Sequence, residues 1–150
     1  MTNRIILSLS GVLLSTTLFA FPCFYTLAKS NCWVDYDVTV NVYDTKNNQL
    51  LKTVVVPKGK AFVREAFVCE AGQTLNYTAT FTPKIWENEI GAVYNAQHYW
   101  ALPVELTAKT KAWEVSVCYP DAFAEVPFPP QASGNCKCDF ASIPVIPPQP

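Results

Sequence analysis

The sequence predicts an all-β protein: an antiparallel, immunoglobulin-like β-sandwich of about six to seven strands, stabilised by disulfide bonds and followed by an extended proline-rich C-terminal arm. Three observations lead to this class. Apolar and polar residues alternate with a period of two between Trp33 and Tyr119. Turn residues separate the alternating runs at intervals of roughly 10–12 residues, which is typical of sandwiches. Six cysteines follow an N-terminus of the secretory type.

The alternation places the expected strands at residues 35–42, 50–57, 61–69, 74–82, 92–102 and 111–119. The first two should form a hairpin, because residues 44–48 have the composition of a turn. One side of each run is apolar and is expected to face the core. The inward-facing residues predicted in this way are Tyr36, Val38, Val40, Val42, Leu75, Tyr77, Ala79, Phe81, Trp113, Val115 and Val117.

The N-terminal 20 residues have the pattern of a cleaved signal peptide. A short positive segment ending at Arg4 precedes an uncharged apolar run, and Ala20 offers a small residue for cleavage. A retained membrane anchor is the main alternative, although a spanning helix usually needs about 20 apolar residues. Acylation of Cys23 is less favoured, because Pro22 directly precedes it. We therefore expect a periplasmic or secreted protein whose mature chain does not insert into a membrane.

The mature chain is expected to divide into a sandwich domain, residues 21–119, and an arm, residues 120–150. Eight of the twelve prolines lie in the arm, where periodicity is lost. The arm also carries Cys136, Cys138 and apolar residues such as Phe123, so we expect residues 120–139 to lie on the sandwich and cover a strand edge. The tail from about residue 142 is expected to be mobile.

The cysteines predict structural disulfides, because their number is even and the expected compartment is oxidising. The preferred pairing joins Cys69 to Cys118, both near predicted strand ends. The arm would then be fastened by bridges from Cys136 and Cys138 to the two N-terminal cysteines. A small metal or redox site at the Cys136-Lys137-Cys138 pair is the alternative. The six residues of this prediction are Cys23, Cys32, Cys69, Cys118, Cys136 and Cys138.

Neither an enzyme nor a cofactor-binding protein is indicated. His98 is the single histidine, and neither a nucleophile elbow nor a zinc-binding helix motif is present. Two pairs of carboxylates, Asp35 with Asp37 and Glu87 with Glu89, are more simply solvated positions than a glycosidase or calcium site. The net charge of −1 and the lack of a basic stripe argue against nucleic acid as a partner.

The longest connection, residues 83–97, is the favoured place for binding, because recognition often uses long loops on a rigid scaffold. Its aromatic residues and those just after it predict a protein-binding or carbohydrate-binding patch. The competing interpretation is that Trp86 and Trp100 fill the core. Asn76 begins a glycosylation sequon that matters only in a eukaryote. The candidate binding residues are Trp86, Tyr94, His98, Tyr99 and Trp100.

We therefore expect an exported, non-enzymatic protein-interaction module. In a bacterium it would be an accessory subunit of an envelope or secretion assembly, or a secreted factor directed at a host. A carbohydrate-binding module that uses exposed aromatic rings is the alternative.

Overall fold

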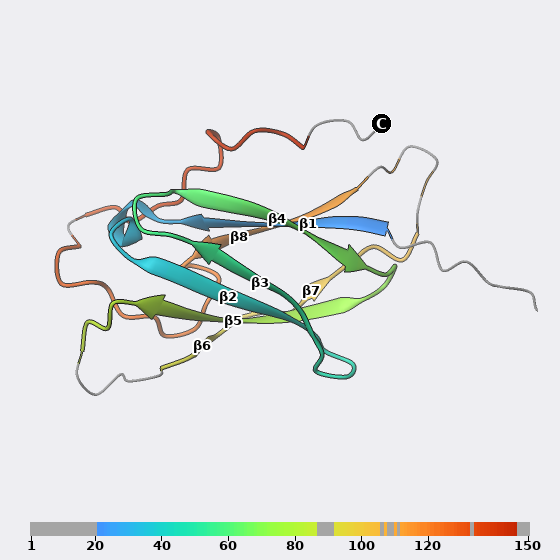
Figure 1. Cartoon of the computed structure of the whole chain (residues 1–150), viewed down its shortest axis with the longest axis horizontal. Helices are drawn as coiled ribbons and strands as arrows, with labels where there is room; N and C mark the ends of the chain where they lie inside the picture. Colours follow the sequence, from blue (N-terminus) through green and yellow to red (C-terminus); the bar gives the residue numbers. More distant parts are fainter. Residues whose placement is uncertain are drawn as a thin grey trace, which may run out of the picture.

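The structure is a computed structural model that describes residues 21–86, 92–105, 107, 110, 112–132 and 134–146. The predicted signal peptide, residues 1–20, and the pair Glu87 and Glu89 lie outside these residues. The described part is all-β and forms two sheets, called sheet A and sheet B (Figure 1). It contains no helix long and apolar enough to cross a membrane.

Sheet B follows the sequence prediction closely. In β2 and β5 buried apolar residues alternate with partly exposed, mostly polar residues, as in a sheet with one face on the core. β2 and β3 form the predicted hairpin, and β5 pairs with the other side of β2. The single strand expected at residues 92–102 is instead two short strands that pair separately with β5. The strands are β3 (Leu50–Val56), β2 (Asp37–Asp44), β5 (Thr74–Thr82), β6 (Tyr94–Asn95) and β7 (Trp100–Ala101).

Sheet A consists of β4 (Phe62–Cys69), β1 (Phe21–Lys29) and β8 (Trp113–Tyr119), in that order. β1 pairs antiparallel with β4 but parallel with β8, so the prediction of a purely antiparallel sandwich is wrong for this pair. With β1 between β4 and β8, and with consecutive β2 and β3 in one sheet, the predicted immunoglobulin-like topology is not confirmed.

The core lies between the sheets and is rich in aromatic rings. Trp33, in the short 3₁₀ helix η1 (Asn31–Trp33), is fully buried and packs edge-on against Tyr36 and Tyr119. Edge-to-face contacts of this kind add to the stabilisation from burial itself. The predicted inward-facing residues are all buried or packed against the core, which confirms this prediction.

Lys29, at the end of β1, exposes 3% of its surface. Among the described residues it is the only buried side chain that carries a formal charge. Its ammonium group donates to the carbonyl oxygens of Tyr36 and Pro57 over 2.6 and 2.9 Å, and lies 3.5 Å from that of Val34. Burial lowers the pKa of Lys29, and the nearby carboxylates of Asp37 and Asp35 oppose that shift. Lys29 thus ties β1 of sheet A to the start of β2 and the end of β3.

All six cysteines form disulfides, as predicted, but the preferred pairing is wrong in part. Cys69 and Cys118 cannot meet because β1 separates their strands and they lie near opposite ends of sheet A. Cys23 does not reach the arm, since it is buried in the core and bonded to Cys69. The bridge from the N-terminal region to Cys136 was among the expected pairings and is present. The bridges are Cys23–Cys69, Cys32–Cys136 and Cys118–Cys138.

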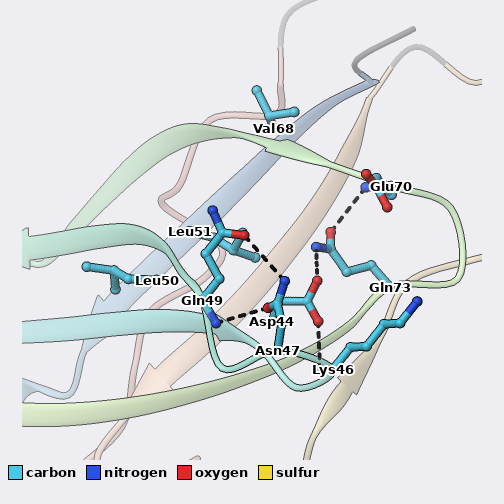
Figure 2. A pocket seen from close by; sticks show the side chains of 9 residues that line it. All are labelled: Asp44, Lys46, Asn47, Gln49, Leu50, Leu51, Val68, Glu70 and Gln73. Carbon is cyan, nitrogen blue, oxygen red and sulfur yellow. Dashed lines mark hydrogen bonds between the residues drawn. The ribbon is translucent and has the colours of Figure 1, made fainter. Parts of the chain in front are cut away.

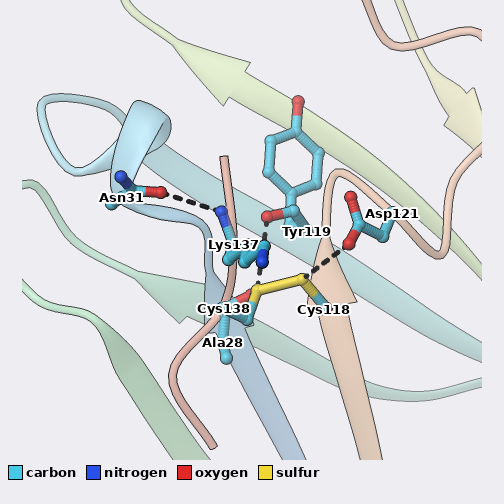
Figure 3. The surroundings of a disulfide bond; sticks show 7 residues. All are labelled: Ala28, Asn31, Cys118, Tyr119, Asp121, Lys137 and Cys138. Atoms are coloured by element: carbon cyan, nitrogen blue, oxygen red, sulfur yellow. Dashed lines mark hydrogen bonds between the residues drawn. A yellow bond between two sulfur atoms is a disulfide. The ribbon is translucent and has the colours of Figure 1, made fainter. Parts of the chain in front are cut away.

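The segment after β8 first contacts the edge of sheet B and then returns to sheet A. The main chain at Ala122 and Ala124 hydrogen-bonds to β6 and the residues after it, which covers that edge. Figure 3 shows Cys138 bonded to Cys118 of β8, with the adjacent Lys137 N–H donating to Asn31. Farther on, Arg64 of β4 donates over 2.7 Å to the carbonyl of Pro144, which lies in the segment predicted to be mobile.

Candidate functional site

Two turns meet at one end of the molecule and enclose a groove, the turn-end groove. One turn joins β2 to β3 and the other joins β4 to β5. The cavity between them has a volume of about 660 Å3, and a second one of about 320 Å3 adjoins it and shares four lining residues. Figure 2 shows the larger cavity, lined by Asp44, Lys46, Asn47, Gln49, Leu50, Leu51, Val68, Glu70 and Gln73.

The β2–β3 turn is held by local hydrogen bonds that its sequence predicts. Asp44 accepts a bond from the backbone N–H of Lys46 over 2.8 Å, which is the geometry of an Asx turn. Asn47 accepts from the N–H of Gln49 over 3.0 Å in the same way. Asn48 has a φ of 55°, a left-handed conformation that asparagine tolerates better than most residues. The turn therefore presents its polar side chains in a fixed arrangement.

The β4–β5 turn needs a glycine and is braced by a neighbouring strand. Gly72 has a φ of 72°, which a side chain would strain. Its N–H donates to the carbonyl of Pro103 over 2.8 Å, and the N–H of Leu102 donates to the carbonyl of Gln73 over 2.9 Å. The segment that follows β7 thus supports this turn from behind.

Gln73 joins the two turns across the floor of the groove. Its Nε2 donates to Oδ2 of Asp44 over 2.8 Å, and its Oε1 accepts from the N–H of Glu70 over 3.1 Å (Figure 2). The hydrogen bond from Gln73, followed by that from the Lys46 N–H, lowers the pKa of Asp44. The Asp44 carboxylate is therefore held in its ionised form on the groove floor.

The walls of the groove combine exposed apolar side chains with charge. Leu50 at the start of β3 and Val68 near the end of β4 expose 51% and 66% of their surface. Val104 exposes 76% and lies beside Gly72. The exposed carboxylate of Glu70 and the ammonium of Lys46 stand at the rim. The described lining holds no histidine, cysteine or aromatic ring.

The structure does not bring the five predicted binding residues together on one surface. Tyr94 is buried and stacks on Phe81, and Trp86 contacts the edge of the same ring. Trp100 is partly buried against the core. His98 and Tyr99 are exposed and line a separate depression of about 480 Å3.

The remaining residues for which the sequence suggested a site have structural roles. Asp37 accepts a hydrogen bond from the backbone N–H of Lys58 over 2.6 Å, which fixes the turn between β3 and β4. Cys136 and Cys138 belong to different disulfides, so both bridges must open before their thiolates could hold a metal. No cluster of three potential metal-binding residues occurs in the described ranges. Asn76 lies on β5, where its Oδ1 accepts from the N–H of Tyr77.

Sequence reasoning missed the turn-end groove. The sequence predicts only turns at residues 44–49 and 70–73. Their meeting depends on the pairing of β2 with β5, which are separated by β3 and β4 in the sequence. Two signals were available: Leu50 is an apolar residue directly after a turn, and Val68 lies between two inward-facing residues of β4.

No protein-family model, no curated protein and no solved structure matches this chain. The class that can be stated is therefore structural: an all-β protein of two sheets whose three disulfides fit an oxidising compartment.

Proposed function

We propose that this protein is an exported, non-enzymatic module that binds another protein through the turn-end groove. It would act in the periplasm or outside the cell, as an accessory subunit of an envelope or secretion assembly or as a secreted factor directed at a host. The disulfides support the oxidising compartment, and the predicted signal segment supports export.

The observation that carries the proposal is the exposure of apolar side chains on a rigid rim. Leu50 and Val68 each expose half or more of their surface and line a cavity of about 660 Å3, and the exposed Val104 lies nearby, beside Gly72. The turns that hold them are fixed by hydrogen bonds, and the Cys23–Cys69 bridge secures the end of β4. Recognition sites commonly lie on turns that a rigid β-scaffold positions, and clustered exposed apolar residues mark interaction surfaces.

Carbohydrate binding receives less support. That function needs aromatic rings presented together on an open face. Of the five predicted residues, Tyr94 is buried, Trp86 and Trp100 are half-buried, and only His98 and Tyr99 are exposed.

Photo-crosslinking from two matched lysine positions tests the proposal. Lys46 lies at the rim of the groove, whereas Lys58 is also exposed but lies in the turn at the other end of β3. Each is replaced in turn by a photoreactive amino acid, and the full chain is expressed in its source cell. We expect a discrete protein adduct from position 46 and none from position 58. Adducts of equal yield from both positions, or none from either, would refute a groove-directed protein partner.

A further inference from the structure

We propose that the turn-end groove binds an extended peptide segment of a partner protein, and that this segment carries apolar side chains together with a lysine or arginine. The proposal rests on the proposed function and names the chemical class of the partner. It is carried by three features of the groove: a free strand edge, exposed apolar side chains and a carboxylate pair.

The first feature is the edge of β3. Within the described strands, β3 pairs with β2 alone, and its neighbour on the other side is β4 of sheet A, to which the main chain makes no ladder. The ion pair between Lys52 and Glu65, at 3.6 Å, links β3 and β4 next to the groove. At Leu50 and Leu51 the groove opens instead. An extended peptide can add to such an edge through its main-chain hydrogen bonds.

The second feature is the spacing of the apolar side chains. Leu50 and Leu51 come from β3, Val68 comes from β4, and the cavity lies between them (Figure 2). In an extended segment alternate side chains point to one side. A peptide that lies along β3 would therefore place alternate apolar side chains between Leu50 and Val68. Covering these two side chains would remove apolar surface from water, which stabilises the complex.

The third feature is charge. Asp44 and Glu70 place two carboxylates beside the apolar wall, and Lys46 supplies a single ammonium group. Glu105, exposed next to Val104, adds a further negative charge at the same end. A lysine or arginine of the partner would make charge-assisted hydrogen bonds with these carboxylates. An acidic segment would be repelled.

The apolar and acidic lining also favours this peptide over a sugar, a nucleic acid or a second copy of the chain. A sugar would find no aromatic ring among the described lining residues, and a nucleic acid would meet net negative charge. The proline-rich tail of a second copy has no lysine or arginine after Lys137, so it lacks the required cation. The partner is therefore a different protein with a basic, apolar and extended segment.

Selection from a library of displayed nonapeptides against the full, oxidised mature chain tests the inference. We expect enriched peptides to alternate apolar and polar residues and to contain lysine or arginine. Their affinity should fall at least about tenfold for Leu50→Asp, since a buried apolar contact is replaced by a desolvated charge. Val93→Asp is the matched control, because Val93 is exposed to a similar degree, 54%, but lies next to β6 and does not line the groove. It should bind as the unchanged protein does.

A second pair of variants tests the charge. Glu70→Lys should weaken binding of the same peptides about tenfold or more, whereas Glu125→Lys, at an exposed carboxylate outside the groove, should not. The folded state of each variant is checked by its circular dichroism and its three disulfides.

The outcomes separate the inference from the proposed function. Loss of binding in both groove variants, with both controls unchanged, supports the inference. Peptides that bind all four variants equally would overturn the groove site but leave a protein-binding module. Enrichment of acidic peptides would overturn the charge argument. Failure to enrich any peptide would overturn the peptide inference, and the crosslinking from positions 46 and 58 would then decide the proposed function on its own.

Discussion

The side-chain amide of Gln73 donates a hydrogen bond over 2.8 Å to the carboxylate of Asp44, and so connects the turn after β4 with the turn after β2. These residues are 29 positions apart in the sequence. The Oε1 of the same side chain accepts from the backbone N–H of Glu70. Gln73 therefore reinforces, through its side chain, a contact between the two turns that the pairing of β2 with β5 also supports.

Replacing Gln73 by leucine should lower the free energy of unfolding by about 1–2 kcal/mol, because two hydrogen bonds are lost. Urea unfolding followed by circular dichroism measures this change. Gln49→Leu is the control, since its side chain makes only a 3.4 Å contact with Asn47, and it should stay within about 0.5 kcal/mol of the unchanged protein. Equal losses in both variants would show that Gln73 has no special bridging role.

The lowered pKa of Asp44 predicts a pH dependence. Because the folded-state pKa lies below the ordinary value, the stabilisation from the Asp44 carboxylate is present above the ordinary pKa and is lost as the pH falls through the lowered one. Asp44→Asn should therefore be less stable than the unchanged protein at neutral pH, and the difference should shrink in acid. Unfolding measured across the acidic range tests this, and a difference that is constant with pH would contradict it.

Lys29→Met should be strongly destabilising. The substitution leaves the carbonyl groups of Tyr36 and Pro57 without the ammonium that they now bond, at a cost of about 3 kcal/mol. Lys58→Met, on the surface, is the control and should have little effect. Thermal and urea unfolding both measure the difference. A mild effect at Lys29 would mean that methionine fills the site without loss.

The two bridges of the C-terminal segment should differ in their contribution to stability. The two cysteines of the Cys32–Cys136 bridge are 104 positions apart in the sequence, and those of the Cys118–Cys138 bridge are only 20 apart. Loop-closure entropy predicts contributions of roughly 4.7 and 3 kcal/mol respectively. Paired serine substitutions, Cys32→Ser with Cys136→Ser and Cys118→Ser with Cys138→Ser, followed by denaturant unfolding, test the order. The opposite order would show that native contacts of the segment outweigh the entropy of the unfolded chain.

Removing the exposed ring of Tyr99 should leave peptide binding unchanged. Tyr99→Ala deletes a side chain with 69% exposure that lies in the separate depression beside His98. We expect the selected peptides to bind this variant with the same affinity, measured by titration calorimetry. A large loss of affinity would instead place the binding site at the aromatic residues that the sequence predicts.

Alternation of apolar and polar residues predicted β2, β3, β4, β5 and β8, because each buries one face only. The alternation did not predict β1, because both faces of this central strand of sheet A are buried. Tyr25 and Leu27 are buried on one face, and Thr26 and Ala28 on the other. A strand of this kind lacks the alternating pattern.

The disulfide pairing and the groove depend on contacts between distant parts of the chain. Cys69 meets Cys23 only because β1 pairs with β4. Likewise, Gln73 meets Asp44 because β2 pairs with β5, which places Asp44 opposite Leu75, two residues after Gln73. Local patterns identify the turns, but they do not tell which turns are neighbours.

The most direct test of the turn-end groove as a peptide-binding site uses NMR to measure the hydrogen exchange of backbone amides. Exchange rates are compared with and without a bound peptide from the selection. If an extended segment adds to the edge of β3, exchange should slow at those amides between Leu50 and Lys52 that point away from β2. It should stay unchanged at Lys58 and Gly59, in the turn at the other end of the strand. Slowed exchange at His98 and Tyr99 instead, or none at β3, would contradict the turn-end groove as the binding site.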